Sequence, residues 1–411
     1  MTQSTRTSFR SALLRTASGV GLAAVIAAVA APGARAEMPG WMGDVKLGVQ
    51  VQAGMLINTD TAGSGVQFGH LFTDRANVPT LNQSLFTLSK TVDPKAEGFD
   101  WGFKLQGMVG SDARFTRFMG FGNTAQTSRV QLDLMEANLS FHLPVVTEGG
   151  VDLKVGLYPT PIGYETIDPS TNPFYTHSYI FNFGIPLKHA GAYAIVHATD
   201  LIDVYAGADT GMQTTFGKGD NNRAAAGLFG LQFNFADADL TILALSHFGA
   251  ENARVVDPSQ KLRYENDAVI TYKKGSYTFV TELNWIHDDF GKANAYGIAQ
   301  YVSYTVNDSL ALNLRAEFFH DDKGFFVAAF PGNNDFVQAE LGRPNGSFGV
   351  GKASYGSLTV GASYKPPGLG DFNVLVRPEL RYDRELSGKK AYNGGRDKGA
   401  LTLAADVIFG F

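Results

Sequence analysis

Cysteine is absent from the 411-residue chain, and this absence excludes a disulfide framework and a lipidated cysteine. Long apolar runs are also missing after residue 31, so the sequence predicts no membrane-spanning helix beyond that point. Residues 37–411 therefore fit neither a disulfide-stapled secreted domain nor a helical membrane protein.

Basic residues are too few for a protein that binds nucleic acid. The chain has 34 Lys and Arg residues against 39 Asp and Glu residues, a net charge of −5. Four arginines and no acidic residue lie in residues 1–36; without that segment, 30 basic residues stand against 39 acidic ones, a net charge of −9. This acidic excess argues against a nucleic-acid partner and, in a pore, favours cations.

The first 36 residues have the organisation of a secretory signal peptide. Arginines precede an apolar stretch from Ala17 to Ala31, and the small-x-small sequence Ala34-Arg35-Ala36 follows. We therefore expect residues 1–36 to be removed on export and residues 37–411 to form the mature protein. An uncleaved anchor fits less well, because the apolar stretch is short and rich in alanine.

Apolar residues alternate with polar or small ones through most of the remaining chain. In residues 401–411, one set of alternate positions is apolar throughout, from Leu401 to Phe411, and the other is mostly small or polar. A strand of an outer-membrane β-barrel has this form, because one face meets lipid and the other meets water. The 47 glycines, 30 phenylalanines and 16 tyrosines suit close strand packing and aromatic girdles at membrane interfaces.

Sixteen segments share this alternation, and several carry charges along their second face. A soluble sandwich or solenoid with the apolar face as its core remains the alternative, although it would not normally aim so many charges at one side. In the fourth segment the alternation slips near Met135–Glu136, which suggests a β-bulge. The segments are 46–57, 81–92, 99–111, 129–143, 151–158, 189–198, 201–211, 224–235, 238–249, 261–273, 276–287, 294–306, 309–321, 353–365, 371–384 and 400–411.

The connections between these segments alternate strictly between long and short. Bacterial outer-membrane barrels show this alternation, with long external loops and short periplasmic turns. The sequence therefore predicts an all-β fold, a transmembrane antiparallel β-barrel of about sixteen strands in the bacterial outer membrane. Sixteen strands about 4.8 Å apart give a backbone diameter of about 32 Å, wide enough for a water-filled lumen.

Charged residues on the inward faces are candidates for the pore wall. Opposite charges at neighbouring inward positions can polarise a lumen and tune its selectivity, but they can equally be structural ion pairs. The candidate wall residues are Arg263, Asp267, Arg315, Glu317, Arg377, Glu379, Arg381 and Asp383.

Loop 159–188, between the fifth and sixth segments, is the candidate constriction. It contains five prolines and six residues of Phe or Tyr, so it is too apolar for a free surface loop and should fold inward against the lumen wall. Its charged residues Glu165, Asp168, His177 and Lys188 are the candidate constriction residues, with ordinary turn and solvent chemistry as the alternative. Loop 322–352 is the alternative constriction.

Several motifs resemble the OmpL-like β-barrel porin family. They are Gly-x-Tyr-Pro-Thr-Pro-x-Gly-Tyr-Glu at 156–165, Asn-Pro-Phe-Tyr-Thr-His-Ser-Tyr at 172–179, Pro-x-x-His-x-Gly at 186–191 and Arg-Pro-Glu-Leu-Arg-Tyr-Asp at 377–383. The resemblance covers the mature chain in order and implies a pore without naming a solute. In sixteen-stranded porins generally, the third external loop folds inward, and loop 159–188 has the same ordinal position.

The function that we expect is an outer-membrane porin, a passive channel for small hydrophilic solutes or ions. The expected partners are outer-membrane lipid, the barrel-assembly machinery and these solutes, and a homo-oligomer is left open. The alternatives are a plugged structural or docking barrel, or a lipase-like barrel hydrolase using Asn138, Ser140 and His142, which share one strand face. That face points to the lumen after the expected bulge, away from lipid.

Motifs of enzymes and metalloproteins give little support to catalysis. GxSxG, HExxH, phosphate loops and metal-ligand spacings are all absent, and the eight histidines are scattered. We therefore expect no enzyme activity, no cofactor and no metal. Residues 220–222 and 333–335 could hold Ca²⁺ at loop tips, with plain polar turns as the competing interpretation.

Overall fold

The structure is a computed structural model that describes residues 44–61, 65–122, 126, 128–335, 349–370 and 372–411. The expected signal peptide, residues 1–36, lies outside the described residues, and so does part of loop 322–352. Residues 46–411 form one structural unit, which is built from antiparallel strands.

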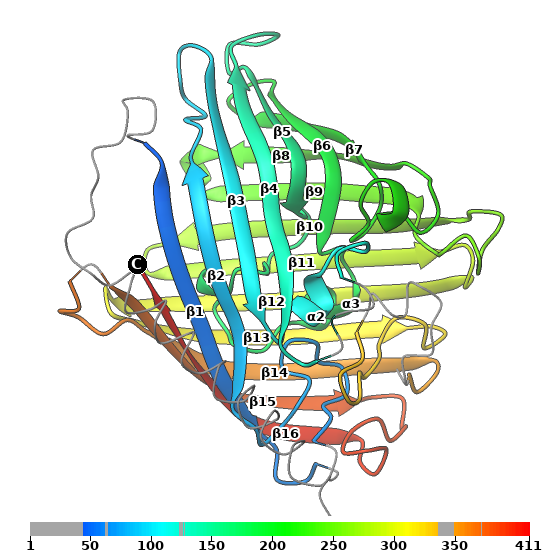
Figure 1. Cartoon of the computed structure of the whole chain (residues 1–411). Helices are drawn as coiled ribbons and strands as arrows, with labels where there is room; N and C mark the ends of the chain where they lie inside the picture. The colour runs from blue at the N-terminus through cyan, green and yellow to red at the C-terminus, as the bar shows by residue number, and fades with distance from the viewer. Residues whose placement is uncertain (1–43, 62–64, 123–125, 127, 336–348, 371) are drawn as a thin grey trace, which may run out of the picture. The chain divides into compact units, whose positions relative to one another are not determined.

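Sixteen strands form a closed barrel in which every strand pairs with its neighbours in the sequence (Figure 1). The barrel closes where β1 pairs with β16, from Gln50 opposite Gly410 to Ile57 opposite Leu403. The strands are β1 Lys46–Ile57, β2 Thr80–Lys90, β3 Asp100–Gly110, β4 Gln131–Leu143, β5 Val151–Pro159, β6 Lys188–His197, β7 Ile202–Asp209, β8 Ala226–Phe235, β9 Leu240–Ala250, β10 Leu262–Lys274, β11 Tyr277–Asp288, β12 Ala293–Asn307, β13 Leu310–Asp321, β14 Ala353–Tyr364, β15 Asn373–Glu385 and β16 Gly399–Gly410.

The barrel prediction is confirmed strand by strand. Each expected segment corresponds to one observed strand, and the ends agree to within two residues. The expected bulge is present as well, because Gln106 pairs with Glu136 while Gly107 pairs with Leu134, which leaves Met135 without a partner in the ladder. Alternating faces and turn signals are local properties of a sequence, so they specify this fold well.

The two faces of the wall differ in the way the alternation predicts. On β16, Leu401, Leu403 and Val407 are exposed on the outer face, whereas Thr402 and Asp406 are buried on the inner face. Large exposed apolar residues recur on the outer face of most other strands, including Leu314, Leu358 and Leu380. A continuous apolar outer surface of this extent matches a wall that contacts lipid hydrocarbon.

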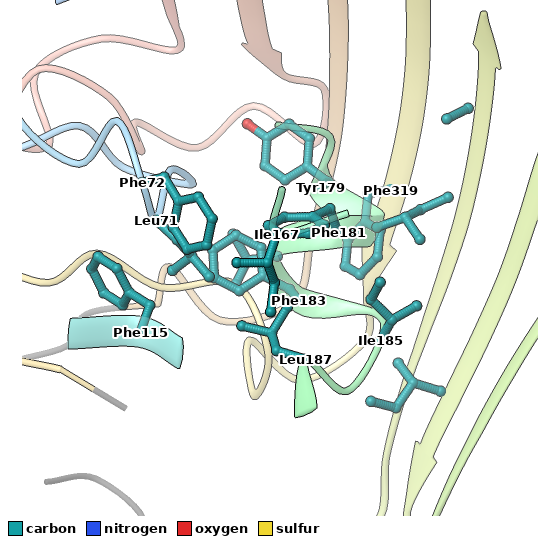
Figure 2. Close-up of a cluster of buried hydrophobic side chains, with 14 of the residues drawn as sticks. Leu71, Phe72, Phe115, Ile167, Tyr179, Phe181, Phe183, Ile185, Leu187 and Phe319 are labelled. Atoms are coloured by element: carbon teal, nitrogen blue, oxygen red, sulfur yellow. The ribbon is translucent and has the colours of Figure 1, made fainter. Parts of the chain in front are cut away.

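The interior of the barrel is partly filled by loops, which corrects the expectation of a simple water-filled lumen. A buried apolar cluster joins Phe72 of the first long loop, Phe115 of the second and Phe181 of the third (Figure 2). Phe330 and Tyr392, from two later loops, also belong to it, together with inward-facing strand residues such as Tyr301 and Phe319. Apolar side chains on five long loops can be buried only by folding these loops inward, because the outside of each loop meets water.

Short helices occur only in connections among the described residues: α2 Ala113–Thr116, α3 Tyr179–Phe183 and the 3₁₀ turns η2 Pro169–Thr171, η3 Gly217–Gly219 and η4 Ala236–Ala238. Within the described part of the chain, no helix is long and apolar enough to span a membrane.

We predict that Leu403→Arg destabilises the inserted barrel. Leu403 lies near the middle of β16 and is 53% exposed on the outer face of the barrel, so an arginine at this position would enter hydrocarbon. A charge at that depth costs about 2–4 kcal/mol of unfolding free energy, against about 0–1 kcal/mol near an interface. Leu47→Arg, at the end of β1 and equally outward, is the control; urea unfolding in lipid vesicles measures both. Equal losses would contradict the lipid-facing assignment.

Candidate functional site in the barrel interior

The third long loop, residues 160–187, lies inside the barrel between β5 and β6. Its base is closed by a hydrogen bond from Thr160 N to Leu187 O of 3.0 Å. Along the loop, Asp168 caps η2 by accepting from Ser170 N, and Ser178 caps α3 by accepting from Phe181 N. The prolines of this segment restrict the backbone further, so the loop has a defined path without long helices or strands.

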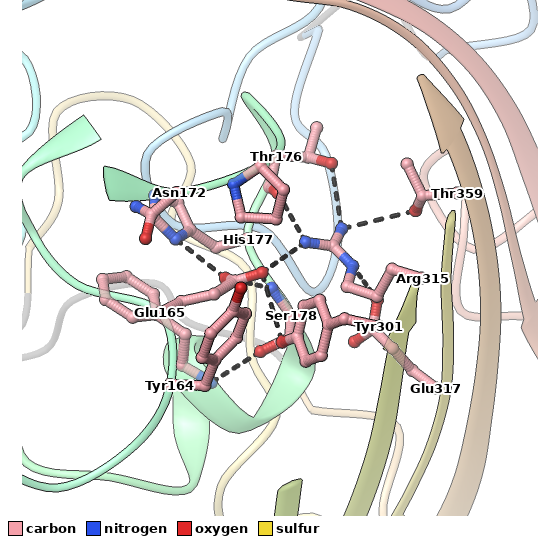
Figure 3. Close-up of polar contacts among 12 residues, drawn as sticks. Tyr164, Glu165, Asn172, Thr176, His177, Ser178, Tyr301, Arg315, Glu317 and Thr359 are labelled. Atoms are coloured by element: carbon pink, nitrogen blue, oxygen red, sulfur yellow. Dashed lines mark hydrogen bonds and ion pairs between the residues drawn. The ribbon is translucent and has the colours of Figure 1, made fainter. Parts of the chain in front are cut away.

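Arg315, on the inner face of β13, binds the loop from the wall (Figure 3). Its Nη1 donates to Glu165 Oε1 at 2.6 Å and to the carbonyl of Thr176 at 2.7 Å. Its Nε lies 2.8 Å from Glu317 Oε1. The guanidinium is fully buried, so these partners replace the water that would otherwise solvate its charge.

Two further arginines, on β15, hold the same loop. Arg377 donates to the carbonyls of Pro169 and Asn172, both at 2.7 Å, and makes a two-point pair with Asp406. Arg381 donates to the carbonyl of His177 at 2.8 Å.

Carboxylates on the same part of the wall accept from loop amides. Glu379 accepts from Tyr175 N at 2.8 Å, and Glu317 accepts from Tyr179 N at 2.7 Å. Wall charges of both signs thus anchor the loop backbone.

Glu165 and His177 form the charged centre of this loop. His177 Nδ1 and Glu165 Oε2 are 3.0 Å apart, and Ser178 N donates to the same oxygen at 2.9 Å. Burial opposes the charge of Glu165, but Arg315, His177 and the Ser178 amide outweigh it and lower the pKa of Glu165 to about 2. Burial lowers the pKa of His177, so the ring is neutral and Nδ1–H donates to Glu165.

The candidate wall residues all lie on the inner face, and all eight are buried rather than open to a lumen. Six of them, on β13 and β15, belong to the loop anchor: Arg315, Glu317, Arg377, Glu379, Arg381 and Asp383. The other two lie on β10, where Arg263 pairs with Asp288 and Asp267 accepts from Asn284.

The four candidate constriction residues occupy three different environments. Glu165 and His177 are in the anchor described above. Lys188 is fully buried against Asp133, with its Nζ 2.6 Å from Oδ2. Asp168 lines a cavity and accepts from Gln50 Nε2 at 2.9 Å.

A polar cavity of about 880 Å³ occupies the end of the barrel that carries the short turns. Its charged lining residues are Lys90, Lys104, Lys154, Lys365, Glu136 and Asp168. A crevice of about 180 Å³ between the third loop and the wall shares Lys104, Gln106, Glu136 and Asp168 with this cavity. The two spaces thus meet on the side of the barrel formed by β3 and β4.

Sequence reasoning missed the residues that line this cavity, above all Lys104 and Glu136, whose side chains pair at 2.6 Å. Neither was among the candidate pore residues, because inward charges occur on most strands. Nothing in the sequence distinguishes a wall position that the loop covers from one that it leaves open.

The residues of the hydrolase alternative are not arranged as a catalytic set. Asn138 donates to Glu136 at 3.0 Å, and His142 Nδ1 lies 2.7 Å from Asp152 Oδ1. Neither side chain bonds Ser140 among the described residues, whereas a serine nucleophile needs a base within hydrogen-bond reach.

A family model described as "Putative beta-barrel porin-2, OmpL-like" matches residues 44–411. The chain belongs to this porin family. It is therefore an integral outer-membrane porin, which confirms the family resemblance of the motifs and agrees with the apolar outer wall. Among curated proteins, none matches the chain significantly.

Solved outer-membrane proteins share the fold of this porin at low sequence identity. An anion-selective porin from Comamonas acidovorans has a TM-score of 0.55 at 10% identity, covering 89% of this chain and 99% of that one. The outer membrane channel DcaP of Acinetobacter baumannii has a TM-score of 0.51 at 11% identity, covering 89% of this chain and 97% of DcaP. OmpT of Vibrio cholerae, in a trimer form, has a TM-score of 0.50 at 12% identity, covering 89% of this chain and 99% of OmpT. At such identities the likeness shows the fold alone.

We predict that acid releases the loop anchor. Because the pKa of Glu165 falls from an ordinary 4.5 to about 2 in the folded state, its ion pair stabilises the fold fully above about pH 4.5. This stabilisation is lost as the pH falls through about 2. Hydrogen exchange of the Ser178 amide should therefore accelerate between pH 4.5 and 2, after correction for intrinsic exchange. In Glu165→Gln the corrected exchange rate of the same amide should change little between pH 4.5 and 2. An acceleration equal to that of the wild type would contradict the assignment.

Proposed function

We propose that this porin is a narrow diffusion channel whose solute path follows the β3–β4 side of the interior. The observation that carries the proposal is the polar cavity of about 880 Å³ and its continuation into the crevice beside the third loop. The loop is anchored to β13 and β15 on the far side, so the β3–β4 side is the one that it leaves open.

The constriction in this proposal is the crevice, where the loop faces Lys104 and Glu136. Asp168 and Glu165 line this crevice, and Glu165 also holds the loop in place together with His177 and Lys188. Polar side chains of Lys104, Gln106, Glu136 and Asp168 line the crevice beside apolar ones such as Ile162 and Phe181, so a small hydrophilic solute finds hydrogen-bond partners there. No catalytic step is part of the proposal.

Local charge gives the channel a preference for anions. The cavity is lined by four lysines and two acidic residues, whereas the acidic net charge of the chain had favoured cations. Charges that line a path act at short range and in a confined space, so they outweigh distant surface charges screened by salt. We also propose a homo-oligomer, supported by the trimer form of the OmpT neighbour.

Deleting residues 166–183 should raise the single-channel conductance severalfold. The deletion removes the loop carbonyls to which Arg315, Arg377 and Arg381 donate, while Glu165 and every strand remain. Planar-bilayer recordings measure the conductance, and heat-modifiable migration on gels checks that the variant barrel is folded.

Two results would overturn this channel. Wild-type protein that gives no stepwise current in any salt would exclude diffusion through the barrel. An unchanged conductance after the deletion, together with protease cleavage of the loop in whole cells, would place the loop outside the path.

The double variant Lys104→Gln, Lys154→Gln should shift ion selectivity toward cations. Both lysines line the cavity, and the Lys104 side chain is 36% exposed to it. Reversal potentials in a salt gradient measure the preference, which should be for anions in the wild type. Glu136→Gln should shift the ion selectivity further toward anions. Lys292→Gln, in an exposed turn at the opposite end of the barrel, is the control and should leave the selectivity unchanged. A wild type that prefers cations would contradict the assignment.

A further inference from the structure

Two histidines and an aspartate that are distant in the sequence meet on the inner wall of β6, β7 and β9. His189, Asp209 and His247 each offer one ligand atom, and these atoms all lie within 4.8 Å of one another. The exposed fractions of the three residues are 1%, 6% and 1%. The two imidazole rings have centroids 4.7 Å apart and are tilted by 49°. The intervening strand β8 presents only Ala226 opposite Asp209, so the side chains can meet across it.

Hydrogen bonds on the outer edges of both rings leave a nitrogen of each ring directed at Asp209. His189 Nε2 lies 3.1 Å from Thr160 Oγ1, and its buried Nδ1 makes no hydrogen bond to any described residue. His247 Nδ1 lies 3.2 Å from Glu265 Oε2, so its Nε2 faces Asp209. A hydrogen bond that fixes the tautomer and orientation of a histidine, often from a carboxylate, is the usual outer support of a metal ligand.

Each histidine has a nitrogen at the spacing of neighbouring metal ligands from one oxygen of Asp209. His247 Nε2 is 3.2 Å from Asp209 Oδ1, to which it is hydrogen-bonded, and His189 Nδ1 is 3.3 Å from the other oxygen, Oδ2. A metal ion would take the place of the proton in the hydrogen bond of His247. Ligand atoms about 2.0–2.1 Å from a tetrahedral centre lie about 3.3 Å from one another. The His189 nitrogen is thus at a ligand-to-ligand distance from the carboxylate without the geometry of a hydrogen bond to it.

The negative charge around the cluster also favours a bound cation. Glu251 and Glu265 flank His247, at 3.7 Å and 3.2 Å from its Nδ1, and both residues are 2% exposed. Glu251 Oε1 makes no hydrogen bond among the described residues. Arg263, the neighbouring cation on β10, has its Nε 3.0 Å from Asp288. Three buried carboxylates beside two imidazoles are costly unless positive charge lies among them, from protons or from a metal ion.

We propose that His189, Asp209 and His247 bind a divalent transition-metal ion of the Zn²⁺ type, with the fourth position taken by water. Imidazole ligands favour such ions over Ca²⁺ and Mg²⁺, which prefer oxygen alone. Thr160 and Glu265 are the positioning residues of this site. The scattered sequence positions of the three ligands explain why no ligand spacing is visible in the sequence.

The site lies at the base of the third loop, and this location gives it a structural role. His189 is the second residue of β6, and Thr160 follows the last residue of β5. A metal ion there ties both ends of the loop base to β7 and β9, in addition to the backbone bond between Thr160 and Leu187. This role is independent of the solute path proposed above.

Zn²⁺ binding to the full-length refolded protein tests the proposal. The protein is stripped with EDTA, dialysed, and titrated with Zn²⁺ by isothermal calorimetry, with elemental analysis for stoichiometry. We expect one Zn²⁺ per chain with a dissociation constant of about 1 µM or lower, and a higher thermal midpoint with Zn²⁺ than without. His189→Ala and His247→Ala should each weaken binding at least about 100-fold. His320→Asn is the matched control, because His320 bonds Ser354 on β14, away from the cluster, and should bind as the wild type does.

X-ray absorption of the wild type with one equivalent of Zn²⁺ keeps the test decisive even where a histidine variant fails to fold. Two imidazoles and light oxygen ligands are expected around the metal. Three outcomes would overturn the proposal: an all-oxygen ligand shell, a wild type that binds no Zn²⁺ at 100 µM, or histidine variants that fold and bind Zn²⁺ as tightly as the wild type. In each case the positive charge of the cluster would come from protons on the histidines and carboxylates.

Discussion

Closure of the strand ladder is the constraint on which the rest of this structure depends. Hydrocarbon offers no hydrogen-bond partner, so every backbone group of a membrane-spanning strand must find one in the wall itself. The pairing of β1 with β16 satisfies the last free edge. Once the ring is closed, side chains have only two environments, and the strict period of two assigns each residue to lipid or to the interior.

Closure also places the charged side chains of the strands inside the barrel, where groups of the loops must act as their hydrogen-bond and ion-pair partners. Arg315, Arg377 and Arg381 are buried, and each donates to at least one backbone carbonyl of the third loop as well as pairing with wall carboxylates. A planar guanidinium presents five donors, so it can bind a carboxylate and a loop carbonyl at the same time. On β13 and β15, the charged residues expected along the wall are therefore the ones that anchor the loop.

The sequence predicted the strands and faces well because those depend on local alternation, whereas the interior depends on contacts between distant residues. Arg315 and Glu165 are 150 positions apart, and no periodicity indicates that they meet. The aromatic and proline-rich composition of residues 159–188 indicated an inward loop. It could not indicate which wall the loop would cover, so the charged positions on β13 and β15 were left as either lumen charges or structural ion pairs, and Lys104 and Glu136 were missed. His189, Asp209 and His247 were missed for the same reason, because only the order of the strands around the barrel brings them together.

The distribution of anchors around the ring explains where open space remains. The base of the loop is fixed at β5 and β6, and its body is bound by Asn284 on β11, by Arg315 on β13 and by Arg377 on β15. These contacts draw the loop across the interior toward one arc of the wall. The opposite arc, from β1 to β5, lacks comparable arginines among its described inward residues. There the loop is held by amides, from Gln50 on β1 to Asp168 and from Gln83 on β2 to the carbonyl of Ile167, while Lys104, Gln106 and Asn138 on β3 and β4 line the cavity. Amides and lysines are less costly to leave in contact with water than apolar loop residues are, so the open cavity lies beside β3 and β4.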